Sequence, residues 1–523
     1  MMAARPHAVH LHLRDLLDGL VQVSDRDDCE VRGLAVDSRG VRAGDVFFAC
    51  AGRRSHGLAF LKQAIAAGSV AVVYEVRDAH EVRVLRERYA VPSGPRRVPL
   101  VAVPALSRHL GAIADRFFAH PSRDLTVVGI TGTNGKTSCS HFLAQSLNGL
   151  GGRCEVIGTL GVGAMGHLEP VAHTTPDAVT VHRLLAEMRA RGAGAVAMEV
   201  SSHGLHQGRV AGVRFDTALF TNLTRDHLDY HGDMRTYGRA KRLLFEAAGL
   251  RRAVLNLRDA FGQEILDSLS PEVQATGYYL DAGAPEPGAR HLLPTHIPLV
   301  IGSDLQLHRA GISLRVETPS GSGRIDAALL GRFNAENVLA TLAVLVSMEV
   351  PLDAALARVR ALNTVPGRME AFGAGPGQPL VVVDYAHTPD ALEQALVSLR
   401  AHCEGELWCV FGCGGERDPG KRPLMGAVAE GLADRLVITN DNPRNESPTD
   451  IVINIQQGMQ DPDRPYVCRD RADAIALAVR CARSSDVVLV AGKGHETMQL
   501  LGDQAIPFSD RNEVLRCLAE RHP

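Results

Sequence analysis

Four short runs of apolar, mostly β-branched residues recur through the middle of the chain. They cover 124–131, 195–200, 217–221 and 253–256, and stretches of helical periodicity separate them. Runs that are apolar throughout are typical of strands buried on both faces, and strands that alternate with helices favour a parallel sheet. The pattern therefore predicts an α/β domain with a mostly parallel central sheet.

A second series of apolar runs lies in the last third of the chain. Its members cover 380–385, 407–411, 435–439 and 486–491, and polar residues follow each of them. Ligands in open α/β sheets bind beyond the carboxyl ends of the strands. The pattern predicts a Rossmann-like α/β domain whose polar segments face one crevice. These segments are 384–387, 416–418, 441–444 and 492–496.

The rest of the chain has other patterns of polar and apolar residues. Short strand candidates at 33–37 and 70–74 flank a polar Gly/Arg loop, which suggests a smaller N-terminal α/β domain. Residues 295–330 alternate polar and apolar positions between glycines, and this indicates a small antiparallel appendage. A chain of 523 residues is expected to form about three domains. The predicted domains are 1–104, 105–364 and 365–523.

Composition is ordinary for a soluble globular protein, with 45% hydrophobic and 22% charged residues. A net charge of −3 and the lack of a basic tail argue against a nucleic-acid partner. No apolar run approaches the length of a membrane span, and the first residues lack the apolar core of a secretion signal. Ten cysteines are sparse for this length. We expect a cytoplasmic, monomeric protein with reduced cysteines that lie mostly in the core.

The segment 129–137, Gly-Ile-Thr-Gly-Thr-Asn-Gly-Lys-Thr, lies between a predicted strand and a predicted helix. Glycines allow backbone N–H groups to approach phosphate, and a helix N-terminus adds positive partial charge. We expect Lys136 to neutralise the β- and γ-phosphates of a nucleotide and the Thr137 hydroxyl to hold a magnesium ion. The generic pattern has glycine where this chain has Ile130, so it is missed by one residue. The alternative interpretation is a Gly-rich turn without a ligand.

Lysine is rare in this chain. Only five of the 56 basic residues are lysine, and arginine carries the remaining positive charge. Arginine can supply neither a compact ammonium between two phosphates nor an amine that is readily deprotonated and modified. The lysines are therefore candidates for specific chemistry. They are Lys62, Lys136, Lys241, Lys421 and Lys493.

Five strings, in the same order along the chain, resemble the motifs of the Mur ligase family. The resemblance covers nearly the whole chain and is closest to the members that add meso-diaminopimelate. In that family the phosphate loop lacks the first glycine, which accounts for Ile130. The strings are Gly132-Thr133-Asn134-Gly135-Lys136-Thr137, Glu199-Val200-Ser201-Ser202-His203, Asn222-Leu223-Thr224-Arg225-Asp226-His227, Asp384-Tyr385-Ala386-His387-Thr388-Pro389 and Asp441-Asn442-Pro443-Arg444.

The resemblance implies an ATP-dependent amide ligase of peptidoglycan precursor synthesis. In the implied reaction, the D-Glu side-chain carboxylate of UDP-N-acetylmuramoyl-L-Ala-D-Glu attacks the γ-phosphate of ATP. The amine of meso-diaminopimelate then displaces phosphate from the resulting acyl phosphate. Both partners of the first step are anionic, so the site must gather positive charge and exclude water. The implied partners are these small molecules.

The resemblance also assigns residues to ATP and to two magnesium ions. Thr137 would hold the ion between the β- and γ-phosphates, and Glu199 and His227 a second ion near the acceptor carboxylate. Lys241 stands where the family has a carbamylated lysine, whose CO2-derived carbamate offers oxygen ligands to magnesium. The implied catalytic residues are Lys136, Lys241, His227 and Glu199, and the implied ATP contacts are Gly132, Thr133, Asn134, Gly135, Lys136, Thr137, Ser138, Asn334, Arg368 and Asp384.

Several of these residues also have a simpler interpretation when they are judged without the family. Lys241 would be a solvated helix lysine. Asn334 would be a helix N-cap. Glu199 and His203 would be hydrogen-bonded polar residues at a strand end. Arg53 and Arg54 would be surface charges.

The resemblance also assigns residues to the other two substrates, the UDP-linked dipeptide and diaminopimelate. Arg444 presents a planar fork suited to the distal carboxylate of diaminopimelate, and Glu496 is a partner for an ammonium group. His173 stands where the family commonly has Asn, so the hydrogen bond expected there is not carried over. The implied UDP-dipeptide contacts are Val36, Ser38, Arg53, Arg54, Ser55, Thr174, Thr175, Ser201, Gln207 and Arg209. The implied diaminopimelate contacts are Arg417, Asp441, Asn442, Pro443, Arg444, Gly492 and Glu496.

Two rival interpretations come from other classes. One is a related ligase of the same fold, lysine-adding or of the folylpolyglutamate type, against which Arg444 and the intact N-terminal segment argue. The other is a nucleotide-binding module without catalysis. Such a module has no use for a second metal site, so the presence of Glu199, His227 and Lys241 together disfavours it.

Overall fold

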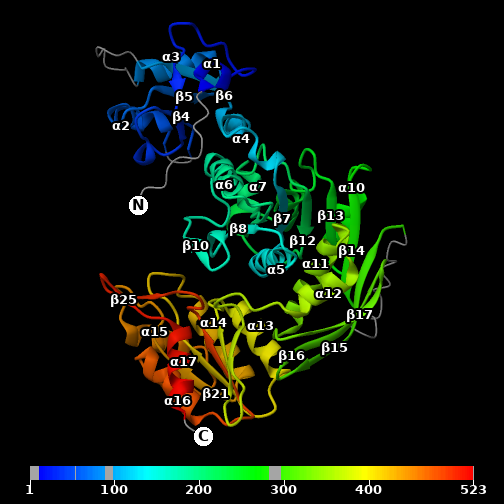
Figure 1. Cartoon of the computed structure of the whole chain (residues 1–523). Coiled ribbons are helices and arrows are strands. Elements are labelled where there is room, and N and C mark those ends of the chain that lie inside the picture. Colours follow the sequence, from blue (N-terminus) through cyan, green and yellow to red (C-terminus); the bar gives the residue numbers. More distant parts are fainter. Residues whose placement is uncertain (1–10, 53–54, 89–97, 282–295, 522–523) are drawn as a thin grey trace. The chain divides into compact units, whose positions relative to one another are not determined.

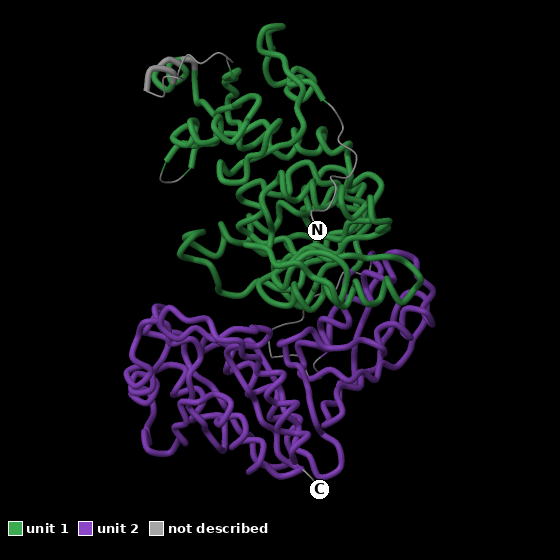
Figure 2. The backbone as a smooth tube through the Cα atoms, turned by 60° about the vertical axis from the view of Figure 1, so that its left-hand side comes forward, with its two compact units in different colours: residues 1–276 green, residues 277–523 purple. Residues whose placement is uncertain are grey.

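The computed structural model describes residues 11–52, 55–88, 98–281 and 296–521. The chain divides into two compact units, Met1–Thr276 and Gly277–Pro523, which are green and purple in Figure 2. Both units combine helices with mainly parallel sheets, so the predicted α/β class is confirmed. The division falls inside strand β14 (Gln274–Leu280). The division into three domains, with boundaries after residues 104 and 364, remains a prediction.

Unit 1 begins with a four-stranded sheet of order β3-β4-β5-β6, in which all neighbours are parallel. Alternate residues of β4 and β5 enter two different hydrophobic clusters, so both faces of the sheet are covered. This double burial explains why these strands are apolar except at Asp45 and Glu75. The elements are β1 (Leu11–His12), α1 (Leu13–Leu16), β2 (Glu30–Val31), β3 (Gly33–Ala35), β4 (Asp45–Ala49), α2 (Leu61–Ala66), β5 (Ala71–Val76), α3 (Ala79–Arg88) and β6 (Leu100–Pro104).

The larger sheet of unit 1 has the order β10-β9-β8-β11-β7-β12-β13. The five strands from β8 to β13 in that order are parallel, while β9 and β10 turn back antiparallel. The predicted mostly parallel sheet is therefore confirmed. Because β7 lies between β11 and β12, the segments that follow these three strands leave the sheet side by side. The strands are β7 (Thr126–Thr131), β8 (Cys154–Gly158), β9 (Gly161–Ala164), β10 (His167–Glu169), β11 (Ala195–Glu199), β12 (Thr217–Phe220) and β13 (Arg252–Asn256).

Seven helices of the described chain accompany this sheet (Figure 1). They are α4 (Leu106–Phe117), α5 (Lys136–Gly149), α6 (Ala178–Ala190), α7 (Ser202–His206), α8 (Leu228–His231), α9 (Met234–Arg242) and α10 (Ala260–Ser268). No helix in the described residues is long and apolar enough to cross a membrane.

Unit 2 begins with residues Gly277–Leu280 of β14, which pair in parallel with β15 (Leu299–His308). The antiparallel strands β16 (Gly311–Thr318) and β17 (Gly321–Ala327) follow. They confirm the antiparallel appendage expected at 295–330. The next two helices are α11 (Arg332–Ser347) and α12 (Leu352–Arg360).

The second sheet of unit 2 has the order β18-β19-β23-β20-β21-β22, with all neighbours parallel except the β18–β19 pair. The four apolar runs predicted from sequence form β19, β20, β21 and β23. Their carboxyl ends lie at one edge, as the hypothesis of a common crevice requires. The strands are β18 (Glu370–Gly373), β19 (Leu380–Asp384), β20 (Leu407–Phe411), β21 (Arg435–Ile438), β22 (Tyr466–Val467) and β23 (Val487–Ala491).

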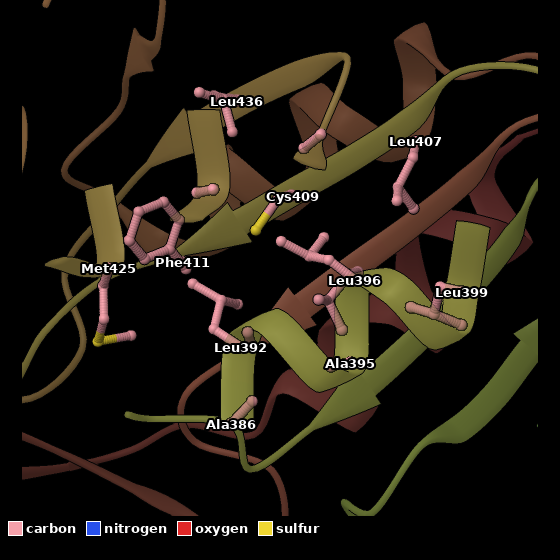
Figure 3. Close-up of a cluster of buried hydrophobic side chains, with 14 of the residues drawn as sticks. Ala386, Leu392, Ala395, Leu396, Leu399, Leu407, Cys409, Phe411, Met425 and Leu436 are labelled. Atoms are coloured by element: carbon pink, nitrogen blue, oxygen red, sulfur yellow. The ribbon is translucent and has the colours of Figure 1, made fainter. Parts of the chain in front are cut away.

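Helices cover both faces of this sheet. Figure 3 shows Leu392, Leu396 and Leu399 packed against Cys409 and Phe411 on one face. Trp408 and Val410 point to the other face, where the last two helices pack. The remaining elements are α13 (Pro389–Arg400), α14 (Lys421–Leu432), α15 (Pro448–Gln456), α16 (Arg471–Cys481), β24 (Met498–Leu501), β25 (Gln504–Pro507) and α17 (Asp510–Glu520).

Candidate functional site

The loop between β7 and α5 has the geometry of a phosphate-binding loop. Gly135, the N-cap of α5, has φ 84°, a left-handed conformation that glycine adopts without strain. Gly132 must also be glycine, because a Cβ at this position would overlap the Thr221 hydroxyl. No side chain caps α5, so the N–H groups of its first turn are directed at the loop.

Lys136 folds back over this loop. Its Nζ donates to the carbonyl oxygens of Gly132 and Thr133, at 2.9 Å each. The N–H groups of Thr133 and Asn134 donate to the backbone and side-chain oxygens of Asn222. The segment after β12 therefore holds the loop, and the ammonium lies where a phosphate-binding loop places its ligand.

Glu199 lies at the end of β11 and is 1% exposed. Its Oε2 accepts hydrogen bonds from the hydroxyls of Thr137, at 2.9 Å, and Thr159, at 3.1 Å. Its Oε1 accepts from the Thr159 N–H at 2.9 Å. Glu199 is thus hydrogen-bonded, as its simpler interpretation requires. It also contacts Thr137, the residue that we predicted to hold a magnesium ion.

Lys241 is buried, with 1% of its surface exposed, so its interpretation as a solvated helix lysine is wrong. Its Nζ donates to the Gly132 carbonyl at 2.7 Å and lies 4.3 Å from the centroid of the Tyr237 ring. Burial, and then the charge of Lys136, lower the pKa of this amine well below its ordinary value. Burial therefore disfavours the charged form of this amine relative to an amine in water.

His227 belongs to a cluster of rings that the sequence did not predict. Its ring centroid is 4.8 Å from that of His203, which lies 4.2 Å from Tyr230 and 5.4 Å from His231. Burial, and then the neighbouring histidines, lower the pKa of His231 to about 4. His231 follows His227 by one helical turn, and this spacing was the signal in the sequence that could have placed His231 in the cluster.

The donors around Glu199 suit magnesium. Within the described stretches, no three His, Cys, Asp or Glu side chains converge as a metal site. A carboxylate and threonine hydroxyls do converge, and magnesium prefers such oxygen donors while it keeps waters and phosphate oxygens as its other ligands. An unmodified Lys241 ammonium would repel a cation nearby. Thr137 and Glu199 therefore fit the ion, and Lys241 fits it only after its charge is removed.

Five of the residues assigned to the dipeptide end of the substrate lie together around α7, before its start and after its end. The Thr175 hydroxyl accepts from the Ser201 N–H at 3.0 Å. Arg209 donates from Nη1 to the Thr175 carbonyl at 2.8 Å and from Nε to the Gln207 side chain at 2.9 Å. The Thr174 hydroxyl lies 3.0 Å from that of Thr159, which joins this group to Glu199.

The remaining assignments to this substrate fall elsewhere. His173, the departure from the family pattern, is exposed. Ser38 is buried and donates to the Gln63 side chain at 3.0 Å. Val36 and Ser55 lie in the N-terminal part of unit 1. Arg53 and Arg54 lie outside the described residues.

In unit 2, Asn334 is the third residue of α11 rather than its N-cap, which is Gly331. Its Nδ2 donates to the Leu330 carbonyl at 2.8 Å, and its Oδ1 accepts from Asn337 at 3.2 Å. The N-cap interpretation is therefore wrong. The buried amide is instead held rigidly by its neighbours.

Arg368 and Asp384 form a second group in unit 2. The Arg368 guanidinium lies 4.7 Å from the centroid of the Tyr385 ring. Its Nε is buried and has no hydrogen-bond partner among the described residues. The Asp384 carboxylate accepts from the N–H groups of Met369, at 2.7 Å, and Ala386, at 2.8 Å. Burial raises the pKa of Asp384, although the charge of Arg368 opposes this shift.

Arg444 has φ 51°, a left-handed conformation that is uncommon outside glycine. The hairpin β24–β25 holds it, because its N–H donates to the Leu500 carbonyl at 3.0 Å and its carbonyl accepts from Gly502 at 2.8 Å. Its Nη1 donates to the Gly415 carbonyl at 2.9 Å. A Cβ on Gly414 would touch both Arg444 and Arg417, so the two arginines flank this glycine.

The other residues assigned to diaminopimelate join the same group. Asn442 Nδ2 donates to Glu496 Oε2 at 2.9 Å. A Cβ on Gly492 would lie 2.7 Å from an Asp441 oxygen, so these residues are also adjacent. Pro443 connects Asn442 to Arg444. The structure thus brings this set together, and it adds Lys493, whose role the sequence did not assign.

Models of three Mur ligase domains match the chain. The Mur ligase family catalytic domain matches residues 30–118, the Mur ligase middle domain 130–345, and the glutamate ligase domain 367–494. The UDP-N-acetylmuramoyl-L-alanyl-D-glutamate--2,6-diaminopimelate ligase of Alkalilimnicola ehrlichii is 51% identical over 514 residues, which cover 98% of this chain and 99% of the relative.

Solved structures agree with this similarity. A UDP-N-acetylmuramoyl-L-alanyl-D-glutamate--2,6-diaminopimelate ligase superposes with a TM-score of 0.71 at 32% identity, over 98% of this chain and 100% of the other. MurF ligase from Thermotoga maritima, in complex with ADP, shares the fold with a TM-score of 0.57 at 16% identity, over 94% and 97% of the two chains.

Proposed function

The chain belongs to the Mur ligase family, and we propose that it adds meso-diaminopimelate to UDP-N-acetylmuramoyl-L-Ala-D-Glu at the expense of ATP. Similarity over nearly the whole length to a relative named for this reaction supports the proposal. The group formed by Arg444, Asn442 and Glu496 carries the choice of amino acid. The product is a precursor of peptidoglycan.

The first step joins two anions. The D-Glu side-chain carboxylate of the dipeptide attacks the γ-phosphorus of ATP, an acyl phosphate forms, and ADP leaves with the electron pair of the broken P–O bond. Lys136 neutralises the phosphates from its position over the loop. Thr137 and Glu199 would hold magnesium, with His227 as a further assigned ligand, and magnesium would supply charge neutralisation when bound.

Lys241 reacts with CO2 in this proposal. Its neutral amine forms an N–C bond to CO2 and releases one proton, which converts a nitrogen base into an anionic oxygen donor. The burial of the amine beside the Gly132 carbonyl supports this assignment, because an ammonium is costly there. The carbamate would complete the oxygen environment that Thr137 and Glu199 begin.

In the second step the amine of diaminopimelate attacks the acyl carbon, and phosphate leaves from the tetrahedral intermediate. Arg444 binds the distal carboxylate of the amino acid through its planar fork. Glu496 binds an ammonium group. Lysine lacks the distal carboxylate, so it leaves Arg444 without its partner and is the weaker substrate.

Separate groups bind the remaining substrate parts. Asn334, Arg368 and Asp384 serve the nucleoside and phosphates of ATP. The group formed by Thr174, Thr175, Ser201, Gln207 and Arg209 serves the dipeptide. The N-terminal residues Val36, Ser38, Arg53, Arg54 and Ser55 serve the uridine nucleotide. A monomeric state and a cytoplasmic location remain predictions.

An ADP-release assay with a panel of amino acids tests the proposal. The purified protein is given ATP, magnesium and UDP-N-acetylmuramoyl-L-Ala-D-Glu, with meso-diaminopimelate, lysine or no amino acid. We expect ADP release and the tripeptide product with diaminopimelate only. The absence of ADP would refute a ligase, and equal turnover with lysine would refute the assignment of the amino acid.

A further inference from the structure

Three cationic side chains of unit 2 are at most 2% exposed in the described residues, namely Arg422, Arg471 and Lys493. Buried cations are rare unless they are paired. Each of these three donates to a segment that carries residues assigned to diaminopimelate. Arg422 donates to the Gly414 carbonyl, Arg471 to the Ala491 carbonyl, and Lys493 to the Asn442 side chain.

Lys493 has the most direct connection of the three to the assigned residues. Its Nζ donates to Asn442 Oδ1 at 3.0 Å, to Glu496 Oε2 at 2.8 Å and to the Met498 carbonyl at 2.7 Å. An ammonium has three donors, and all three are used. The 0% exposed side chain therefore links the segment after β21 to the segment after β23 and to the hairpin that begins at β24.

This link fixes how Asn442 is oriented. Asn442 Oδ1 accepts from Lys493 and from the Leu500 N–H at 3.0 Å, so it must be the oxygen of the amide. The Nδ2 group then donates to Glu496 Oε2 at 2.9 Å. Without the lysine, the amide loses one of the two donors that hold Oδ1 in place and oppose its rotation by 180°, and the Leu500 N–H remains as the other.

The same link selects one oxygen of Glu496. Oε2 accepts from both Lys493 and Asn442, whereas Oε1 accepts no hydrogen bond from the described residues. Burial raises the pKa of Glu496, but the hydrogen bond and charge of Lys493, together with smaller contributions from Asn442 and His495, outweigh burial and hold the pKa below its ordinary value. The carboxylate is thus anionic, with one oxygen held by the protein and the other available to a ligand.

We propose that Lys493 is a positioning residue for the amino-acid substrate, which it does not contact but for which it holds Glu496 Oε1 and Asn442 in the binding orientation. This inference rests on the proposed function. It predicts that loss of the Lys493 ammonium raises KM for diaminopimelate and leaves KM for ATP and for the UDP-dipeptide unchanged.

A purely structural role for Lys493 makes a different prediction. A buried ion pair that only stabilised the domain would, when broken, lower the melting temperature and reduce the amount of active enzyme. That change lowers kcat for all substrates together and leaves each KM unchanged. The separation of KM from kcat therefore distinguishes the two roles.

The test begins with the wild type, whose failure to release ADP with diaminopimelate would refute the proposed function and not this inference. Lys493→Met removes the charge and keeps most of the length of the side chain. We expect KM for diaminopimelate to rise about 10-fold, the scale of a lost charged hydrogen bond. KM for ATP and for the UDP-dipeptide should remain unchanged. Arg435→Met, which removes an exposed cation paired with Glu406 in the same unit, is the matched control.

A double-mutant cycle shows whether Lys493 acts through Glu496. Adding Lys493→Met to Glu496→Gln should raise KM for diaminopimelate much less than adding it to the wild type. If the methionine variant does not fold, Lys493→Gln, which retains a donor, replaces it in the same cycle. An unchanged KM for diaminopimelate, an equal rise in all three KM values, or strictly additive effects in the cycle would each overturn the proposal.

Discussion

Lys136 and Lys241 donate hydrogen bonds to the same acceptor, the carbonyl oxygen of Gly132, at 2.9 and 2.7 Å. The two amines come from α5 and α9, which are far apart in the sequence. Two ammonium groups so close together repel each other, and Lys241 is the more buried of the two. The charge of Lys136 thus adds to burial in lowering the pKa of Lys241.

Replacement of Lys241 by alanine should abolish activity, because no carbamate can then form beside the phosphate loop. Short carboxylic acids should restore part of the activity by placing a carboxylate in the vacated space. Steady-state ADP release with and without added acetate or formate measures both effects. Arg242→Ala, which removes the next side chain and its exposed ion pair with Glu246, is the control. Wild-type turnover by Lys241→Ala would refute the role of this lysine.

Thr137→Val keeps the shape of the side chain and removes the hydroxyl that contacts Glu199. We expect kcat/KM to fall about 10²-fold, the scale of a lost preorganised donor at a charged centre. The magnesium concentration at half-maximal rate should rise as well. Magnesium titrations of the wild type, Thr137→Val and Thr137→Ser test this expectation, since serine retains the hydroxyl. Identical titrations for valine and serine would show that this hydroxyl has no part in metal binding.

Arg444→Ala should lower kcat/KM for diaminopimelate about 10²-fold or more, since the substrate carboxylate loses a charged hydrogen-bonding partner. Arg444→Lys keeps the charge but not the fork, so we expect it to recover only part of the loss. The measurement is the ratio of kcat/KM for diaminopimelate to that for lysine. A ratio that does not change in the alanine variant would contradict the selectivity argument.

The buried side chain of His141 should make the stability of the folded protein depend on pH. The residue is 3% exposed within α5, and burial lowers its pKa to about 4. The unfolded chain binds a proton there below about pH 6.5, and the folded chain only below about pH 4. The folded state therefore loses stability as pH falls between these values, by about 3 kcal/mol from this group.

Urea unfolding of the wild type and of His141→Gln between pH 4 and 7 measures this contribution. Glutamine does not titrate, so the free energy of unfolding of the variant should depend less steeply on pH in this window. Parallel slopes for the two proteins would show that His141 does not contribute.

Much of the fold could be predicted from local patterns. A strand buried on both faces is apolar along most of its length. The strands at 126–131 and 487–491 could be recognised in the sequence for that reason. A loop that binds phosphate needs glycines and a helix after it. The segment directly before α5 contains these glycines, so this loop could also be recognised in the sequence. The strand order was not predictable in this way, because it depends on pairing between distant segments.

The sequence by itself determined the α/β class, the phosphate loop and the residue types of the site, because each follows from neighbours along the chain. Tertiary structure alone decided the surroundings of two lysines. Tyr237 of α9 lies beside the Lys241 amine, but the carbonyl that accepts its hydrogen bond, that of Gly132, comes from a remote segment. Asn442 likewise reaches Lys493 from a segment that is remote in the sequence. Burial and pairing arise only when remote segments pack together, and these two properties decide whether an amine is a solvated charge or a chemical group with a specific task.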